Sequence, residues 1–115
     1  MLRNDRIRMQ HMLDSARESV GFVQGKSRDD LGTDRLLTLG ILKCIEIIGE
    51  AAARIDKETQ KKYQNILWSD IIGMRNRLVH IYFDIDLDTI WKTVTQDIPP
   101  LIEELEKVLE KEKEL

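Results

Sequence analysis

The sequence has 115 residues, of which 42% are hydrophobic and 34% charged, and its formal net charge is −3. This length suits one domain, so we expect residues 1–115 to fold as a single unit. The composition is that of a folded, soluble chain and excludes intrinsic disorder. The negative net charge argues against bulk electrostatic attraction to nucleic acid, so any RNA-binding surface has to be a local basic patch.

Targeting and metal signals are lacking in the sequence. No apolar run approaches the roughly 20 residues that span a membrane, and the charged N-terminus does not resemble a signal peptide, so we expect a cytoplasmic protein. Cys44 is the only cysteine and excludes an internal disulfide; its apolar neighbours predict a packed, inert thiol. The two histidines, His11 and His80, lie far apart in sequence, so we expect no metal site and no cofactor.

Hydrophobic spacing predicts helices in the first half of the chain. Apolar residues recur at helical spacing over residues 7–23, which end at the turn around Gly25. Ser27 and Asp30 resemble a helix-start cap, and Thr33 or Asp34 can begin the main helix. That helix is apolar on more than one side, which predicts a central position in the fold.

The third helical region is predicted with less regular boundaries. Residues 56–65 are polar and are interpreted as a connection with one helical turn, for which Thr59 is a candidate cap. Ser69 is the candidate cap of a third helix through Leu78 and Val79, which should fray around residues 83–86.

A fourth helix is predicted to start near Asp86 or Asp88. Its apolar stripe keeps its phase across Pro99 and Pro100, so we expect one kinked helix or two nearly collinear ones. Residues 110–115 are interpreted as a solvated, frayed end. Together these elements predict an all-α fold, an antiparallel up-down four-helix bundle whose last helix is kinked near Pro99-Pro100.

The segment 74–82 concentrates side chains that act on phosphodiesters. Arg75 offers a donor fork for phosphate oxygens, and His80 titrates near neutral pH. Asn76 and Arg77 are candidate substrate-binding or orienting groups, and Tyr82 adds a phenolic hydroxyl.

The spacing of this motif has a geometric consequence. On a regular helix Arg75 shares a stripe with Ile71, Leu78 and Tyr82, whereas His80 lies about 140° around the axis from Arg75. One helix aims both groups at one phosphate poorly, whereas two copies meeting across a two-fold axis can combine them. We therefore favour a composite site in a homodimer.

A purely structural interpretation of the same residues is also open. Arg75 can be a buried arginine paired with Glu46 or Glu50, His80 a hydrogen-bonded core histidine, and Tyr82 a core ring with a wet hydroxyl.

The motif Arg75-Asn76…His80-Ile81-Tyr82 resembles the active-site motif of HepT-type toxins of the HEPN superfamily, which are small all-helical ribonucleases. Segments 46–51, 68–76 and 91–101 also resemble that family, in its order. The resemblance implies a metal-independent endoribonuclease acting as a homodimer on RNA, with Arg75 and His80 as the catalytic pair. It also implies an MNT-type nucleotidyltransferase antitoxin as partner, and AMP transfer (AMPylation) to Tyr82 as the silencing step.

Two other functions remain open from the sequence. The chain can be a non-catalytic helical partner subunit of a nucleotidyltransferase, or a plain dimeric scaffold in which Arg75 and His80 are structural.

Overall fold

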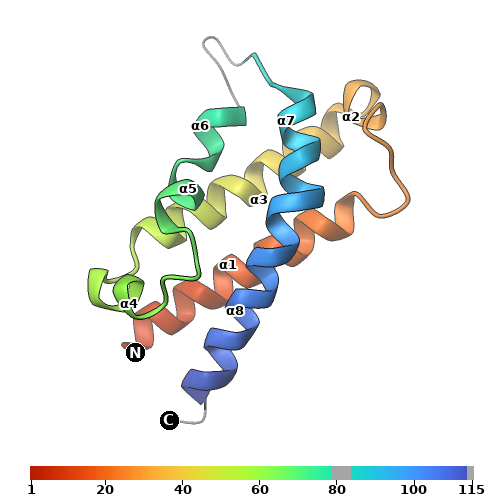
Figure 1. Ribbon diagram of the computed structural model, residues 1–115. Helices are drawn as coiled ribbons and strands as arrows, with labels where there is room; N and C mark the ends of the chain where they lie inside the picture. The colour runs from red at the N-terminus through yellow and green to blue at the C-terminus, as the bar shows by residue number, and fades with distance from the viewer. Residues whose placement is uncertain (79–83, 114–115) are drawn as a thin grey trace.

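Four helical regions run alternately up and down in the computed structural model, which describes residues 1–78 and 84–113 (Figure 1). The first is α1 (Arg3–Phe22), and α3 (Arg35–Ala53) returns beside it. The third region comprises α5 (Trp68–Ile72) and α6 (Met74–Leu78), both on α3. The fourth runs from α7 (Leu87–Lys92) through α8 (Ile98–Lys113), which packs along α1. The predicted all-α bundle is confirmed.

The boundaries of the first two regions follow the sequence signals closely. Helix α1 begins at Arg3, four residues before the predicted start, because its first turn also contributes a buried residue, Asp5. The short α2 (Asp30–Thr33) follows the turn in which the backbone N–H of Ser27 donates to the Asp30 carboxylate at 2.7 Å. Asp34 caps α3 by accepting from the Leu37 N–H at 3.0 Å, as predicted.

The predicted cap of the connecting turn is wrong. Asp56, not Thr59, caps α4 (Lys57–Lys62), accepting from the Glu58 N–H at 2.9 Å. Thr59 is buried inside the helix, and its hydroxyl donates to the Asp5 carboxylate at 2.8 Å. A threonine hydroxyl can satisfy either a helix end or a buried acceptor, and here the tertiary partner is Asp5 on α1.

The prediction of a single third helix from Ser69 to Val79 is also wrong. It is broken at Gly73 into α5 and α6, and Ser69 lies within α5 instead of capping it. The Gly73 N–H donates to the Ser69 carbonyl, and the Asn76 N–H then bonds the Gly73 carbonyl, a tight turn between the two helices. Val79 and the predicted fray at residue 83 lie outside the described residues.

The region around the two prolines is continuous, as expected. Asp86 caps α7 through the Thr89 N–H at 3.0 Å, and a π-helical segment, η2 (Thr93–Asp97), leads into α8. Pro99 and Pro100 cannot donate to the carbonyls four residues earlier, and those carbonyls belong to the π segment. The wider π turn therefore lies where the two prolines interrupt the α-helical hydrogen bonds.

The C-terminal end is not a fray throughout. Helix α8 continues to Lys113, and Glu112 within it is buried, beside the N-terminal ammonium at 3.6 Å and the Lys62 ammonium at 3.4 Å. Charged residues dominate the sequence there, so periodicity alone does not reveal that one of them is buried.

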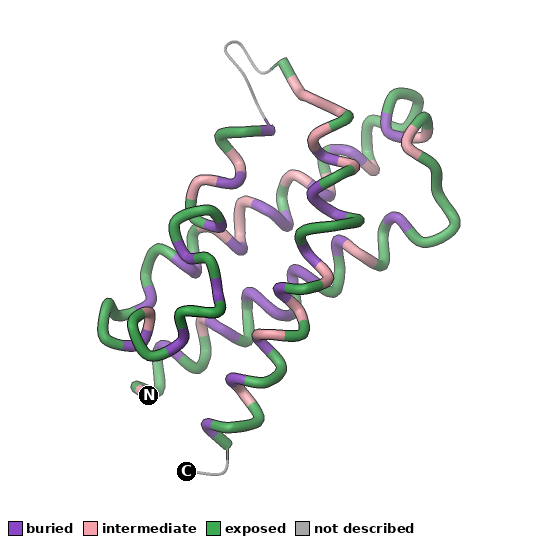
Figure 2. The backbone as a smooth tube through the Cα atoms, viewed as in Figure 1, coloured by how far each residue is buried: buried purple, intermediate pink, exposed green. Residues whose placement is uncertain are grey.

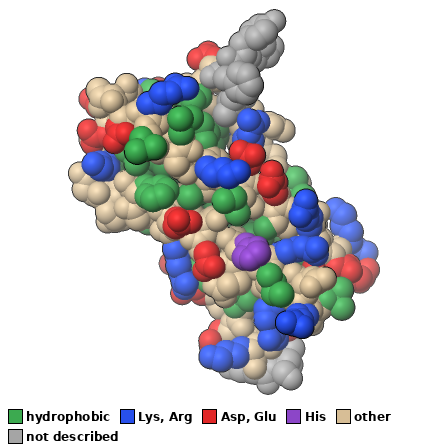
Figure 3. Space-filling view, turned by 180° about the vertical axis from the view of Figure 1, so that it is seen from behind, with side chains coloured by type: hydrophobic (Ala, Val, Ile, Leu, Met, Phe, Trp, Pro, Cys, Tyr) green, Lys and Arg blue, Asp and Glu red, His purple; other side chains and the backbone are tan. Residues whose placement is uncertain are grey.

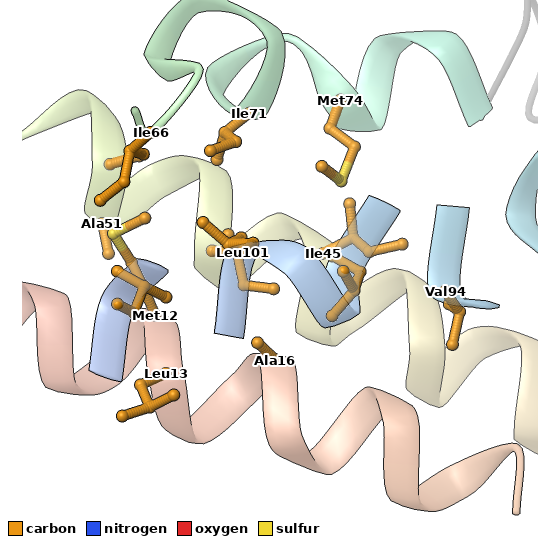
Figure 4. Close-up of a cluster of buried hydrophobic side chains, with 14 of the residues drawn as sticks. Met12, Leu13, Ala16, Ile45, Ala51, Ile66, Ile71, Met74, Val94 and Leu101 are labelled. Atoms are coloured by element: carbon orange, nitrogen blue, oxygen red, sulfur yellow. The ribbon is translucent and has the colours of Figure 1, made fainter. Parts of the chain in front are cut away.

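The core lies between α1, α3, α5–α6 and α8. Figure 2 shows the buried positions repeating along the faces that these helices turn toward one another, and Figure 4 shows part of this core. Gly49 allows close approach of α3 and α5: a Cβ atom there would lie 3.4 Å from the carbonyl oxygens of Ile71 and Ile72. None of the helices in the described residues is long and apolar enough to cross a membrane.

Candidate functional site

Helix α6 positions the part of the motif that the structure describes. Its buried residues Met74 and Leu78 anchor one side on the core, which leaves Arg75 partly exposed at the α3 side. The Arg75 guanidinium Nε lies 3.9 Å from Oε2 of Glu46 on α3, and the two side chains are 43% and 36% exposed. An ion pair this long and this hydrated holds Arg75 only loosely.

The position of Arg75 tests the interpretation in which the motif residues have only a structural role. The pairing of Arg75 with Glu46 is confirmed, but Arg75 is not a buried arginine. Glu50 is exposed on α3, one turn further along, and lines a shallow hollow with Arg8 and Arg54 instead of contacting Arg75. Arg75 therefore remains accessible to an anionic ligand.

Asn76 and Arg77 are both exposed on α6. The structure does not place Arg77 with Arg75: the two are about 200° apart around a helix axis, so they project from nearly opposite sides. Arg77 lines a cavity between α5–α6 and α8. Neither side chain makes a hydrogen bond or ion pair with another described residue.

His80 and Tyr82 lie outside the described residues, so their predicted roles remain predictions. The stripe predicted for a regular helix holds only in part: Ile71 and Leu78 are buried and Arg75 is partly exposed, but the break at Gly73 separates Ile71 from the other two.

Helices α1 and α3 also carry exposed apolar side chains. They are Ile7 and Phe22 on α1 and Leu36 and Leu39 on α3, with Leu36 82% exposed. Figure 3 views the molecule from behind, where hydrophobic side chains mix with both signs of charge. Glu46, the partner of Arg75, lies on the same helix α3.

Two other groups could carry chemistry, and the structure accounts for both. Burial, reinforced by nearby Glu18, raises the pKa of the Cys44 thiol to about 11, so this cysteine stays protonated and inert as predicted. Within the described ranges, no three His, Cys, Asp or Glu side chains group closely enough to hold a metal ion.

Comparison with known proteins agrees with the helical fold and the motif. The family model "Ribonuclease HepT-like" matches residues 12–108, a range that contains the whole motif. The fold and the motif together define a small all-helical domain of the HEPN type. The chain belongs to the ribonuclease HepT-like family.

Curated relatives from bacteria and archaea point the same way. A protein of Caldanaerobacter subterraneus subsp. tengcongensis named "Putative RNase TTE0752" is 35% identical over 105 residues, which cover 91% of this chain and 94% of that protein. The "Probable ribonuclease HepT" of Thermococcus cleftensis is 31% identical over 100 residues, covering 84% of this chain and 91% of that protein. No solved structure matches. Family membership and these names support a ribonuclease activity.

Proposed function

We propose that the chain is the toxin of a toxin–antitoxin module and acts as a metal-independent endoribonuclease. The observation that carries this proposal is the family match over residues 12–108, a range within which Arg75 and His80 lie. The accessible guanidinium of Arg75 on α6 supports it, because a residue locked in the core could not reach a substrate phosphate.

The proposed chemistry uses the nucleophile that RNA carries itself. The 2′-oxygen attacks the adjacent phosphorus, and the bond to the 5′-oxygen breaks, which leaves a 2′,3′-cyclic phosphate and a 5′-hydroxyl. His80 moves a proton, either from the 2′-hydroxyl or to the leaving 5′-oxygen. Arg75 stabilises the negative charge that develops on the phosphoryl oxygens. Asn76 holds or orients substrate in this scheme, whereas Arg77, predicted from the sequence to share that role, projects away from Arg75 and lines a separate cavity.

The primary test is cleavage by purified protein in the presence of EDTA. We expect the wild type to release fragments with cyclic phosphate ends, and Arg75→Ala or His80→Ala to lose about 100- to 1,000-fold in rate. Arg17→Ala is the matched control, because Arg17 pairs only with Glu106 at the surface, where both side chains are about half exposed. Unchanged cleavage in both motif variants would reject the proposed catalytic pair.

We also propose that the site is composite and needs a second copy of the chain. The exposed apolar residues of α1 and α3 suit self-association, and the pair formed by Arg75 and Glu46 lies on the α3 side of α6. In a two-fold dimer one chain supplies Arg75 and its partner supplies His80.

Subunit mixing tests this arrangement directly. Arg75→Ala and His80→Ala proteins are each nearly inactive, but a mixed dimer contains one site with both native groups. Mixing equal amounts should therefore restore roughly a quarter of wild-type cleavage when half of the dimers are mixed. No recovery, with exchange of subunits verified, would place both groups in one chain.

The proposed regulation is AMP transfer to Tyr82 by an MNT-type nucleotidyltransferase antitoxin. The phenolic oxygen would form a bond to the phosphorus of AMP, and with ATP as donor pyrophosphate would leave. The added anion would repel and obstruct an RNA backbone. Intact mass after co-expression with a nucleotidyltransferase encoded beside this gene should show added AMP, lost in Tyr82→Phe. If the two proteins co-purify and neither cleaves RNA, a non-catalytic partner subunit is the better description.

A further inference from the structure

A cavity of about 300 Å³ opens between α5–α6 and the fourth helical region. Its floor is apolar and consists of buried core residues, Ile66, Ile71, Met74 and Leu101. Figure 4 shows the first three on the segments that face α8, with Leu101 on α8 itself. The cavity is large enough to accept one large apolar side chain.

The rim of the cavity is acidic. Asp70 on α5, Asp97 on η2 and Glu104 on α8 face a single cation, Arg77 on α6, which gives three carboxylates against one guanidinium and a net charge of −2. Glu104 pairs with Lys107 at 3.3 Å. The side chains of Asp70, Asp97 and Arg77 make no hydrogen bond or ion pair with other described residues, so their charges remain available to a ligand.

A second hollow adjoins this cavity and differs from it in the charges of its lining. It is lined by several lysines and shares Asn65, Ile66 and Glu104 with the cavity. Three of its lysines are already paired: Lys61 with Glu58, Lys62 with Glu112, and Lys107 with Glu104. Of the two neighbouring depressions, the acidic cavity therefore retains more unpaired charge.

We propose that the acidic cavity is a docking site for a segment of a partner protein that inserts one large apolar side chain and carries lysine or arginine on both sides of it. The apolar floor receives the inserted side chain, and Asp70 and Asp97 pair with the flanking cations. RNA fits this rim poorly, because the unpaired carboxylates of Asp70 and Asp97 repel phosphates that approach them.

The position of the cavity relative to Arg75 gives docking a further consequence. Because Arg75 and Arg77 project from nearly opposite sides of α6, a segment in the cavity contacts α6 without covering Arg75. The partner thus restrains the helix that carries Arg75 while leaving that side chain accessible. This binding does not depend on cleavage, so it can be tested apart from the proposed ribonuclease function.

The test is a titration of methyl-labelled protein with synthetic peptides, followed by NMR. The probe is a short alanine-based helical peptide with one leucine that has lysines on both sides of it. We expect saturable shifts at the methyl groups of Ile71, Met74 and Leu101. The double substitution Asp70→Asn with Asp97→Asn should weaken binding about tenfold, since it removes two rim charges.

Matched controls separate this site from general attraction to an acidic protein. Glu103→Gln removes an exposed carboxylate of α8 that does not line the cavity and should leave affinity unchanged. Peptides with alanine for leucine, or glutamate for lysine, should not shift the three methyl groups. Both aspartates are exposed, so the double variant should keep the wild-type melting temperature.

Three results would overturn the proposal. The first is equal binding of the lysine and glutamate peptides, and the second is an absence of shifts at these methyl groups at millimolar peptide. The third is a short single-stranded RNA that perturbs the three methyl groups while the lysine peptide does not, which would make the cavity part of an RNA-binding surface.

Discussion

The two ends of the bundle use charged residues for opposite purposes. At the end where both chain termini lie (Figure 1), Asp5 and Glu112 are each only 1% exposed and are held by several partners. At the end that carries α6, Arg75 makes one long ion pair, and Arg77, Asp70 and Asp97 make none with described residues. The difference teaches that buried, satisfied charges fix the structure, whereas hydrated, weakly paired charges remain free to bind.

The largest effect is expected from removing Asp5. Its carboxylate accepts from the Asp56 N–H at 3.2 Å and the Thr59 hydroxyl at 2.8 Å, and ties α1 to α4. Asp5→Ala leaves the buried Thr59 hydroxyl and the partly buried Asp56 N–H without this acceptor and should lower the free energy of unfolding by roughly 2–4 kcal/mol. Urea unfolding monitored by circular dichroism measures this. Asp14→Ala, an exposed acid of the same helix, is the control; equal losses would mean that burial of Asp5 is irrelevant.

A smaller loss is expected where α3 and α5 approach most closely. Gly49→Leu should cost about 1–3 kcal/mol, because the added side chain must displace the backbone of Ile71 and Ile72. Gly21→Ala near the end of α1 is the matched glycine, since a Cβ atom there meets nothing within 4 Å, and it should be neutral or stabilising by up to about 1 kcal/mol. A stability loss in Gly21→Ala as large as that in Gly49→Leu would contradict the close approach.

The environment of Glu112 predicts how low pH affects stability at the end of the bundle where both chain termini lie. Burial by itself disfavours its charged form, but the Tyr63 hydroxyl, Lys62 and the N-terminal ammonium favour it and leave the pKa of Glu112 lowered in the folded protein. A lowered pKa stabilises the fold above the unfolded value of about 4.3, and this stabilisation is lost as the pH falls through the folded pKa.

Melting curves of wild type and Glu112→Gln test that linkage. The wild type should be the more stable at neutral pH, and the gap should close as the pH falls through the lowered pKa of Glu112 in the folded protein. Glu103→Gln, on the exposed side of α8, is the control. A gap that is independent of pH between 3 and 7 would show that the Glu112 charge contributes nothing.

The smallest effect on stability is expected at the α6 end. Glu46→Gln removes the partner of Arg75, but the pair is long and hydrated, so the free energy of unfolding should change by less than about 0.5 kcal/mol. A larger loss would mean that Arg75 is held as firmly as Asp5, and the contrast between the two ends would disappear.

Much of this fold could be predicted from the sequence because its helices have clear apolar periodicity and local caps. Asp34 and Asp86, each one of two predicted starting residues for its helix, both cap helices in the structure. The errors have a common cause: tertiary contacts compete with local signals. Thr59 bonds Asp5, fifty-four positions away, instead of a helix end.

The candidate site could be predicted only in part. The sequence placed Arg75 and named Glu46 as a possible partner, and both are found together. It could not separate Arg75 from Arg77, because their directions depend on how α6 packs. It also gave no sign of the acidic cavity, since Asp70 and Asp97 come from different elements and look like ordinary surface acids.

The π segment allows the fourth helical region to accommodate one additional residue. Ile90, Val94 and Ile98 are all buried, as is Thr93, and the π segment that links these positions has a wider turn than an α-helix, closed by i→i+5 hydrogen bonds. A π turn is equivalent to one residue inserted into a helix whose flanks keep their original facing. Length variation by one residue can therefore be absorbed within residues 93–97 while α8 continues to face α1. The same change in the middle of α3 would turn half of its core stripe toward solvent.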